Sequence, residues 1–128
     1  MTGSRPPGDG QLLVALSNAM VAIYKELYGK GPVKVRTWYL DDVVLCVLRG
    51  GLTHGEHTFV DIGRSDQVAR QRDSFHVDTE PVFVQKIEEL TGRRVKTVLD
   101  ANSEEDDVSI LVFLLETAEG AAARLGPN

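Results

Sequence analysis

The two segments that decide the fold are TGRRVKTVL, residues 91–99, and VSILVFLLE, residues 108–116. Gly92 follows a helical pattern and predicts its end, because glycine readily adopts the left-handed conformation of a helix C-cap. The acidic residues between the segments predict a turn, and both segments are rich in strand-forming residues. The last third of the chain therefore reads as helix, strand, turn and almost wholly apolar strand.

Apolar residues occupy both faces of the second of these strands. Side chains alternate along a strand, so Ile110, Val112 and Leu114 share one face while Leu111 and Phe113 share the other. A small domain has helices enough to cover one sheet face, so a second copy or another protein is expected on the other. We predict a homodimer whose interface comprises Met20, Val21, Tyr24, Ile110, Val112 and Leu114.

The N-terminal part of the chain has the spacing of a helix. Apolar residues recur at helical steps from Leu12 to Leu27, and Gly29 and Pro32 lie where the pattern ends. A second apolar set that includes Val21 and Tyr24 widens the arc that can be buried. We therefore expect this helix to pack on two sides, one of which would belong to another subunit.

Residues 33–48 predict an antiparallel hairpin. Apolar and basic residues alternate over residues 33–38, which is typical of a strand with one covered face and one wet, basic face. Asp41-Asp42 supplies the turn, and residues 43–48 form an uninterrupted apolar strand expected inside the sheet with both faces covered. Cys46 lies in that strand, where a buried and unreactive thiol is expected.

The middle of the chain predicts helices. Thr53 followed by Glu56 is a capping-box signature, because each side chain can bond a free backbone donor at the start of a helix. A short helix over residues 54–62 follows, Gly63 interrupts it, and a second, polar helix is predicted over residues 66–75.

A third helix is predicted to open at Thr79-Glu80-Pro81, because proline is favoured in the first turn of a helix. The predicted order of elements is α-β-β-α-α-α-β-β. Short connections make sequential strands antiparallel neighbours. The sequence thus predicts an α+β fold in which helices pack on one face of a four-stranded, mainly antiparallel sheet.

The composition fits one small domain. The chain has 128 residues and a net charge of −5, and we expect a disordered arm at residues 1–10, a domain at 11–117 and a flexible tail at 118–128. No apolar run approaches the roughly 20 residues of a membrane-spanning helix, and the N-terminus lacks a signal-peptide pattern. These features predict a cytoplasmic protein without direct membrane insertion, and the charge disfavours nucleic acid as a partner.

Basic residues in or beside the predicted strands are the candidate ligand-binding set. On one shared face they would form a platform for an anion or a nucleic acid, with an aromatic ring for stacking. The alternative is a solvated face whose charges pair across strands. The set is Lys34, Arg36, Arg49, Arg93, Arg94 and Lys96, with Trp38 or Tyr39 as the ring. Of these, Lys34, Arg36, Arg49 and Lys96 are the predicted anion-binding residues.

The polar clusters contain no recognisable catalytic constellation. His54, Glu56 and His57 fall on one helical turn and could share a divalent metal, but a capping turn with solvated histidines is the favoured interpretation. The acidic residues between 100 and 107 lack the residue order of a calcium-binding loop. We expect no catalytic residue, no metal and no cofactor, since neither a nucleophile with an oriented base nor a phosphate-binding loop is present.

Several separated blocks together resemble the bacterial family named for the C component of a sodium-translocating, membrane-potential-generating system, the MpsC-like family. The resemblance covers residues 11–116. The blocks are Ser17-Asn18-Ala19-Met20, Tyr24-Lys25-Glu26, Gly29-Lys30-Gly31-Pro32, residues 42–48, Leu52-Thr53 with Glu56, Leu90-Thr91-Gly92-Arg93-Arg94-Val95 and residues 107–116. Many relatives have a Pro-Ala-Glu-like turn after Leu-Thr where this chain has His54-Gly55-Glu56, so the start of that helix would differ slightly.

The resemblance implies a function but brings no catalytic residues. It implies a non-enzymatic accessory or regulatory domain beside a membrane-potential-generating, ion or bicarbonate transport system, with a membrane transporter subunit as a partner. A ligand- or nucleic-acid-binding module on the basic strand face is the first alternative. An enzyme with a metal at His54 and His57 is the second.

Overall fold

The computed structural model describes residues 9–117, 119 and 120, with only the backbone described for residues 9 and 74–78. The expected arm and tail fall mostly outside these residues, although the first helix already begins at Asp9. The elements in chain order are α1 (Asp9–Tyr28), β1 (Lys34–Leu40), β2 (Val43–Arg49), α2 (His54–Asp61), α3 (Ser65–Thr91), β3 (Val95–Ser103) and β4 (Val108–Leu115).

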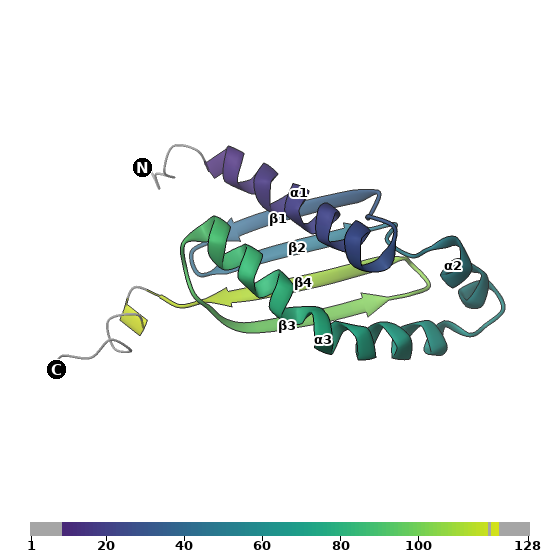
Figure 1. Cartoon of the computed structure of the whole chain (residues 1–128). Coiled ribbons are helices and arrows are strands. Elements are labelled where there is room, and N and C mark those ends of the chain that lie inside the picture. Colours follow the sequence, from purple (N-terminus) through teal and green to yellow (C-terminus); the bar gives the residue numbers. More distant parts are fainter. Residues whose placement is uncertain (1–8, 118, 121–128) are drawn as a thin grey trace.

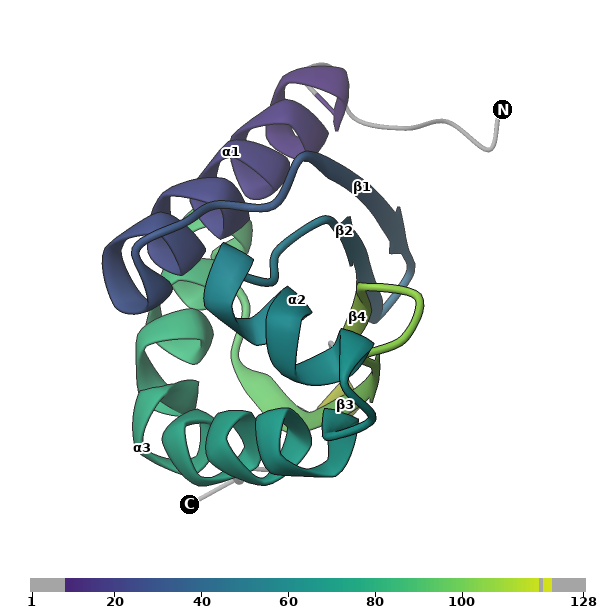
Figure 2. The same ribbon diagram turned by 90° about the vertical axis from the view of Figure 1, so that its right-hand side faces the viewer.

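The strands form one four-stranded antiparallel sheet in the order β1-β2-β4-β3. Helices α1 and α3 lie side by side on one face of this sheet, and α2 lies beyond its end (Figure 1). The end-on view shows both long helices on the same side of the curved sheet (Figure 2). The predicted α+β fold with helices on one face is therefore confirmed.

The core lies between the helices and the sheet. In β2, and in β4 from Leu111 to Leu115, every second residue points to the helices and is almost fully buried, as the alternation of Leu111, Phe113 and Leu115 predicts. From the helix layer, Met20 and Ile87 are both 0% exposed. The remaining members of this buried cluster are Leu16, Ile23, Tyr24, Val44, Cys46, Leu48 and Phe83.

The prediction of a helix break before residue 79 is corrected by the structure. Residues 65–91 form the single helix α3 with Pro81 inside it, and Figure 1 shows the helix changing direction between its two halves. Proline removes one helical hydrogen bond and crowds the preceding turn, which can bend a helix without ending it. Burial of Val68 in the first half and of Phe83 and Ile87 in the second holds both halves against the rest of the protein.

The predicted turns and caps are confirmed. Gly92 ends α3 with a positive φ of 70°, and Asp41 turns the β1–β2 hairpin with a φ of 51°. Thr53 and Glu56 form the full capping box at the start of α2. Cys46 is 0% exposed, and burial raises the pKa of its thiol to about 11.

Candidate interaction surface

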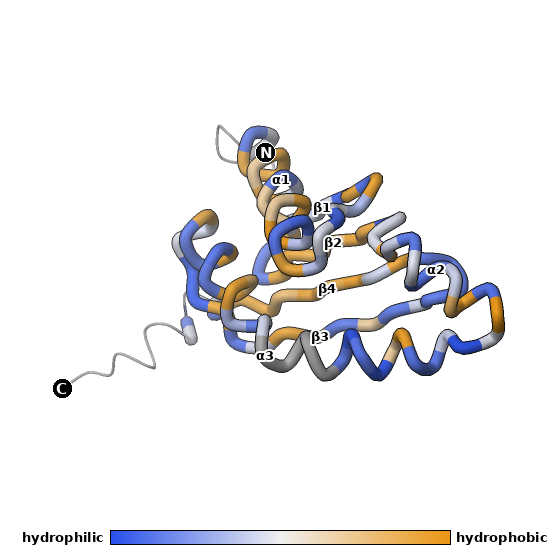
Figure 3. Tube along the Cα trace, turned by 45° about the vertical axis from the view of Figure 1, so that its right-hand side comes forward, coloured by the Kyte–Doolittle hydropathy of each residue, from blue (hydrophilic) through white to orange (hydrophobic). Residues whose placement is uncertain are grey.

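The sheet face opposite the helices, here called the open face, carries four cross-strand rows of side chains. No helix or strand that the structure describes covers this face (Figure 2). Its two middle strands, β2 and β4, consist mostly of hydrophobic residues (Figure 3). Read from β1 to β3, the rows are Lys34–Arg49–Val108–Ser103, Arg36–Val47–Ile110–Ala101, Trp38–Leu45–Val112–Leu99 and Leu40–Val43–Leu114–Thr97.

The apolar part of the open face is wide and well exposed at its edges. Leu40 on β1 is 59% exposed and Leu99 on β3 is 53% exposed. Between these edges lie seven aliphatic residues of β2 and β4 that are only partly buried. Scattered apolar residues are normal on a protein surface, but a contiguous patch spanning four strands marks an interaction site.

Three of the four predicted basic residues gather on the open face. Lys34 lies directly opposite Arg49 in the register, Arg36 lies in the next row, and the Arg36 guanidinium carbon is 4.9 Å from the centre of the Trp38 ring. Lys96 lies apart from these three, at the diagonally opposite corner of the sheet, at the start of β3, where the register with β4 shifts. The sequence therefore identified one basic corner of three residues rather than a platform of four.

The predicted interface residues divide between the surface and the core. Ile110, Val112 and Leu114 lie on the open face and are partly exposed. Met20 and Tyr24 are 0% and 2% exposed within a single copy, so they have no surface left to offer a partner. Their assignment to an interface is corrected. Tyr24 packs against α3 of the same chain, as the Tyr24–Phe83 ring contact of 5.5 Å shows, and Val21 is partly buried.

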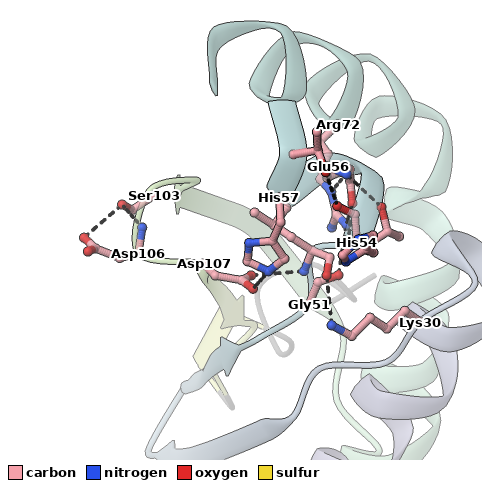
Figure 4. Close-up of polar contacts among 12 residues, drawn as sticks. Lys30, Gly51, His54, Glu56, His57, Arg72, Ser103, Asp106 and Asp107 are labelled. Carbon is pink, nitrogen blue, oxygen red and sulfur yellow. Dashed lines mark hydrogen bonds and ion pairs between the residues drawn. The ribbon is translucent and has the colours of Figure 1, made fainter. Parts of the chain in front are cut away.

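Helix α2 is held at the end of the sheet by polar contacts. None of its own residues is buried. Arg72 from α3 donates to both carboxylate oxygens of Glu56 at 2.6 and 2.8 Å and to the carbonyl oxygen of Gly51 at 3.0 Å (Figure 4). The Arg72 guanidinium also stacks 4.2 Å from the Tyr28 ring centre, which joins α1, α2 and α3 at one point.

A second anchor joins α2 to the β3–β4 turn. The carboxylate of Asp107 contacts His57 Nε2 at 2.9 Å with one oxygen and accepts the backbone N–H of Leu52 at 3.0 Å with the other (Figure 4). The Asp107 carbonyl accepts the N–H of Gly50 at 3.0 Å. His57 and Glu56 are thus both engaged in structural contacts. No group of three or more metal-ligating side chains occurs in the described part of the chain.

The electrostatics of the Arg72–Glu56 pair favour both charges. Burial alone would raise the pKa of Glu56, but hydrogen bonds from Arg72 and from the Thr53 backbone outweigh it and hold the pKa below its ordinary value. Burial likewise opposes the charge on Arg72, and the bonds to Glu56 overcome that effect and raise its pKa. A cleft of about 290 Å³ opens beside the pair, but the charges that border it neutralise each other.

Sequence reasoning missed the structural roles of two arginines. Arg72 falls in the polar helix predicted over residues 66–75, although its position four residues after the buried Val68 places it on the buried side of α3. Arg93 looked like a member of the basic strand set. It donates instead to Tyr39 Oη at 3.1 Å and to the carbonyl oxygens of Asp41 and Glu116, at 2.6 and 2.9 Å, and so ties the sheet ends together.

The fold and the open face define a two-layer α+β protein whose sheet has one apolar face covered by helices and a second apolar face that none of the described elements covers. A family model described as the Na+-translocating membrane potential-generating system (MpsC) matches residues 8–117. The chain belongs to this family, as the resemblance of its sequence blocks implied. No curated protein and no solved structure matches the chain significantly.

None of the described helices is both long and apolar enough to cross a membrane.

Proposed function

We propose that this chain is a non-enzymatic, cytoplasmic accessory domain of a membrane-potential-generating or ion transport system, and that it self-associates through the open face. The link to a membrane-potential-generating system is that of the family to which the chain belongs. The accessory role is supported by two features of the described residues. Polar side chains around α2 make structural contacts, and the open face presents a contiguous apolar surface.

The observation that carries the proposal is the contiguous apolar surface of β2 and β4. Its central row contains Leu45 and Val112, side by side in the register and flanked by Trp38 and Leu99. Exposure of such a surface to water costs free energy, which contact with a matching apolar surface recovers. A homodimer uses the same patch twice and needs no second binding surface.

The binding-module alternative has less support. The basic corner contains three cationic residues of the open face, whereas a nucleic-acid-binding groove usually combines several basic residues with a series of stacking rings. The negative net charge of the chain would oppose a polyanion at longer range. A titration with single-stranded RNA at low salt tests this alternative, which requires binding that weakens when Lys34 and Arg36 are replaced by Ala.

Mass determination by light scattering over a range of concentrations tests the self-association. We expect the full-length chain to shift from monomer to dimer as its concentration rises, and Val112→Glu to stay monomeric because it buries a charge in the interface. Val82→Glu is the matched control, since Val82 lies on α3 and is already 45% exposed. A wild-type chain that remains monomeric up to high micromolar concentration would contradict the self-association.

Affinity capture from native membranes after mild cross-linking tests the accessory role. We expect the tagged chain to recover a subunit of a membrane transport system. Capture of soluble proteins alone, reproduced with Val112→Glu, would contradict the proposed role without affecting the evidence for a dimer.

A further inference from the structure

We propose that two copies pack open face to open face about a two-fold axis that runs along the strands, with Lys34 of each copy pairing with Asp106 of the other. In this arrangement β1 of one copy lies over β3 of the second copy, and β2 lies over β4. The inference rests on the proposed self-association and adds the orientation of the two copies and the residues that select it.

The apolar rows support this orientation. A two-fold axis along the strands places each cross-strand row over the same row of the second copy. In the central row, Trp38 then lies over Leu99 of the second copy, and Leu45 lies over Val112. Leu99 is 53% exposed in one copy, so the Trp38 ring would cover one of the most exposed apolar residues of the face.

The charges at one end of the sheet are complementary under the same axis. Lys34 begins the outermost row on β1, and Ser103 ends that row on β3. Ser103 Oγ bonds the Asp106 carboxylate at 3.1 Å, which keeps Asp106 beside the open face. The axis brings Lys34 of one copy over Ser103 and Asp106 of the second, and symmetry makes this pairing twice.

The other acidic residues of the β3–β4 turn are directed elsewhere. Glu104 borders a cleft with Asp73 of α3, Glu105 accepts a hydrogen bond of 2.7 Å from Ser65 at the start of α3, and Asp107 contacts His57 on α2. Figure 4 shows Ser103 and Asp106 on the side of the turn away from His57. Asp106 is therefore the carboxylate of this turn that is placed to meet a basic residue across the open face.

The opposite end of the sheet has the reverse arrangement of charges. The acidic Asp41-Asp42 turn lies at the end of β1, and Lys96 lies at the start of β3 on the far edge. The axis along the strands brings these two groups together as well. Positive and negative corners thus alternate around the face, and each corner meets one of opposite sign in the second copy.

An axis across the strands fits less well. It would place the row that begins with Lys34 over the row that begins with Leu40, and so put Lys34 onto the aliphatic Leu40, whereas the axis along the strands places Lys34 over the polar Ser103. Burying charges against an apolar surface is unfavourable unless they find partners. Under that axis Lys34 would meet Asp41 of the second copy and would not meet Asp106.

The size of the open face sets the expected strength of the dimer. Two of its four strands have seven residues each, and with ordinary strand spacing the face has a flat footprint on the order of 400 Å². Standard protein interfaces bury about 800 Å² of accessible surface per partner. We therefore expect a dimer that dissociates in the micromolar range, which a concentration series can measure.

Sedimentation equilibrium of charge-reversed variants of the full chain tests the orientation. Lys34→Glu and Asp106→Lys each convert two attractions into repulsions, so each should weaken the dimer by about tenfold. The double variant restores opposite charges with the signs exchanged and should dimerise within about threefold of wild type, because both pairs re-form. Glu26→Lys, an exposed change on α1, is the control and should dimerise like wild type.

Each outcome decides between specific ideas. Rescue in the double variant supports the axis along the strands. Failure of the Lys34→Glu, Asp106→Lys double variant to dimerise overturns the inference. If Asp41→Lys restores the dimerisation of Lys34→Glu and Asp106→Lys does not, the axis runs across the strands. The proposed self-association stands in both cases. A wild-type chain that is monomeric throughout overturns the orientation and the self-association together.

Discussion

Replacing Arg72 with Ala should be among the most destabilising single changes outside the apolar core. The Arg72 and Glu56 side chains are only 9% and 17% exposed, and Arg72 also bonds Gly51 and stacks on Tyr28. Removing one partner of a buried ion pair costs about 3–5 kcal/mol, because the other charge is left without compensation. Since Glu56 retains some access to water, we expect a loss near the lower limit, about 3 kcal/mol.

A loss of that size is measurable by thermal and urea unfolding followed by circular dichroism. For a chain of this length, about 3 kcal/mol corresponds to a fall in Tm of roughly 10–15 °C. Arg72→Lys should fall between wild type and Arg72→Ala, because lysine keeps the charge and loses the two-pronged geometry. The expected loss is a large fraction of the roughly 5–15 kcal/mol that stabilises a typical domain.

Arg70→Ala is the matched control on the same helix. Arg70 pairs with Asp66 at 3.2 Å, but their side chains are 70% and 67% exposed. Such a pair contributes about 0–0.5 kcal/mol. If Arg72→Ala were no more destabilising than Arg70→Ala, the idea that the Arg72–Glu56 pair anchors α2 would be refuted.

Three further predictions concern pH, thiol reactivity and backbone conformation. The pKa of Glu56 is lowered in the folded chain, so its stabilising contribution is complete above its unfolded pKa of about 4.3 and is lost as the pH falls through the lower folded value. In Glu56→Gln, the free energy of unfolding measured in urea should therefore depend less on pH over that acidic range. A pH dependence equal to that of the wild type would contradict this. Because Cys46 is buried with a pKa of about 11, it should react with a thiol reagent at pH 8 only after unfolding, and rapid labelling of the native chain would show otherwise. Gly50→Ala should lower the free energy of unfolding by about 1–3 kcal/mol in chemical denaturation, because φ is +77° and the new Cβ would lie 2.6 Å from a Val33 methyl carbon. The control is Gly55→Ala, whose new Cβ meets no atom within 4 Å and which should be neutral or stabilising. Equal losses of stability in both variants would contradict the account.

The sheet was predictable because its strands carry strong local signals. Alternation in residues 108–115 placed Leu111 and Phe113 on the helix side, and the Asp41-Asp42 turn and Gly92 marked where elements end. The capping box at Thr53 and Glu56 fixed the start of α2 for the same reason. Each of these features depends on residues close together in the chain.

The failures involve contacts between distant residues. Pro81 was read as a helix start because sequence alone does not show that Phe83 and Ile87 are held in the core, so that the helix can bend and continue. Tyr24 was read as an interface residue because its packing partner Phe83 lies on another helix. The role of Arg72 depends on Glu56, sixteen residues earlier, and no local pattern links the two.

The most direct test of the central claim, that the open face becomes covered when copies associate, is the fluorescence of Trp38. This is the single tryptophan of the chain, and it lies in the central row of the open face. As concentration rises through the micromolar range, we predict a blue shift of its emission and weaker quenching by acrylamide, both absent in Val112→Glu. A chain whose mass doubles while Trp38 emission and quenching stay constant would contradict the claim, because its dimer would use another surface.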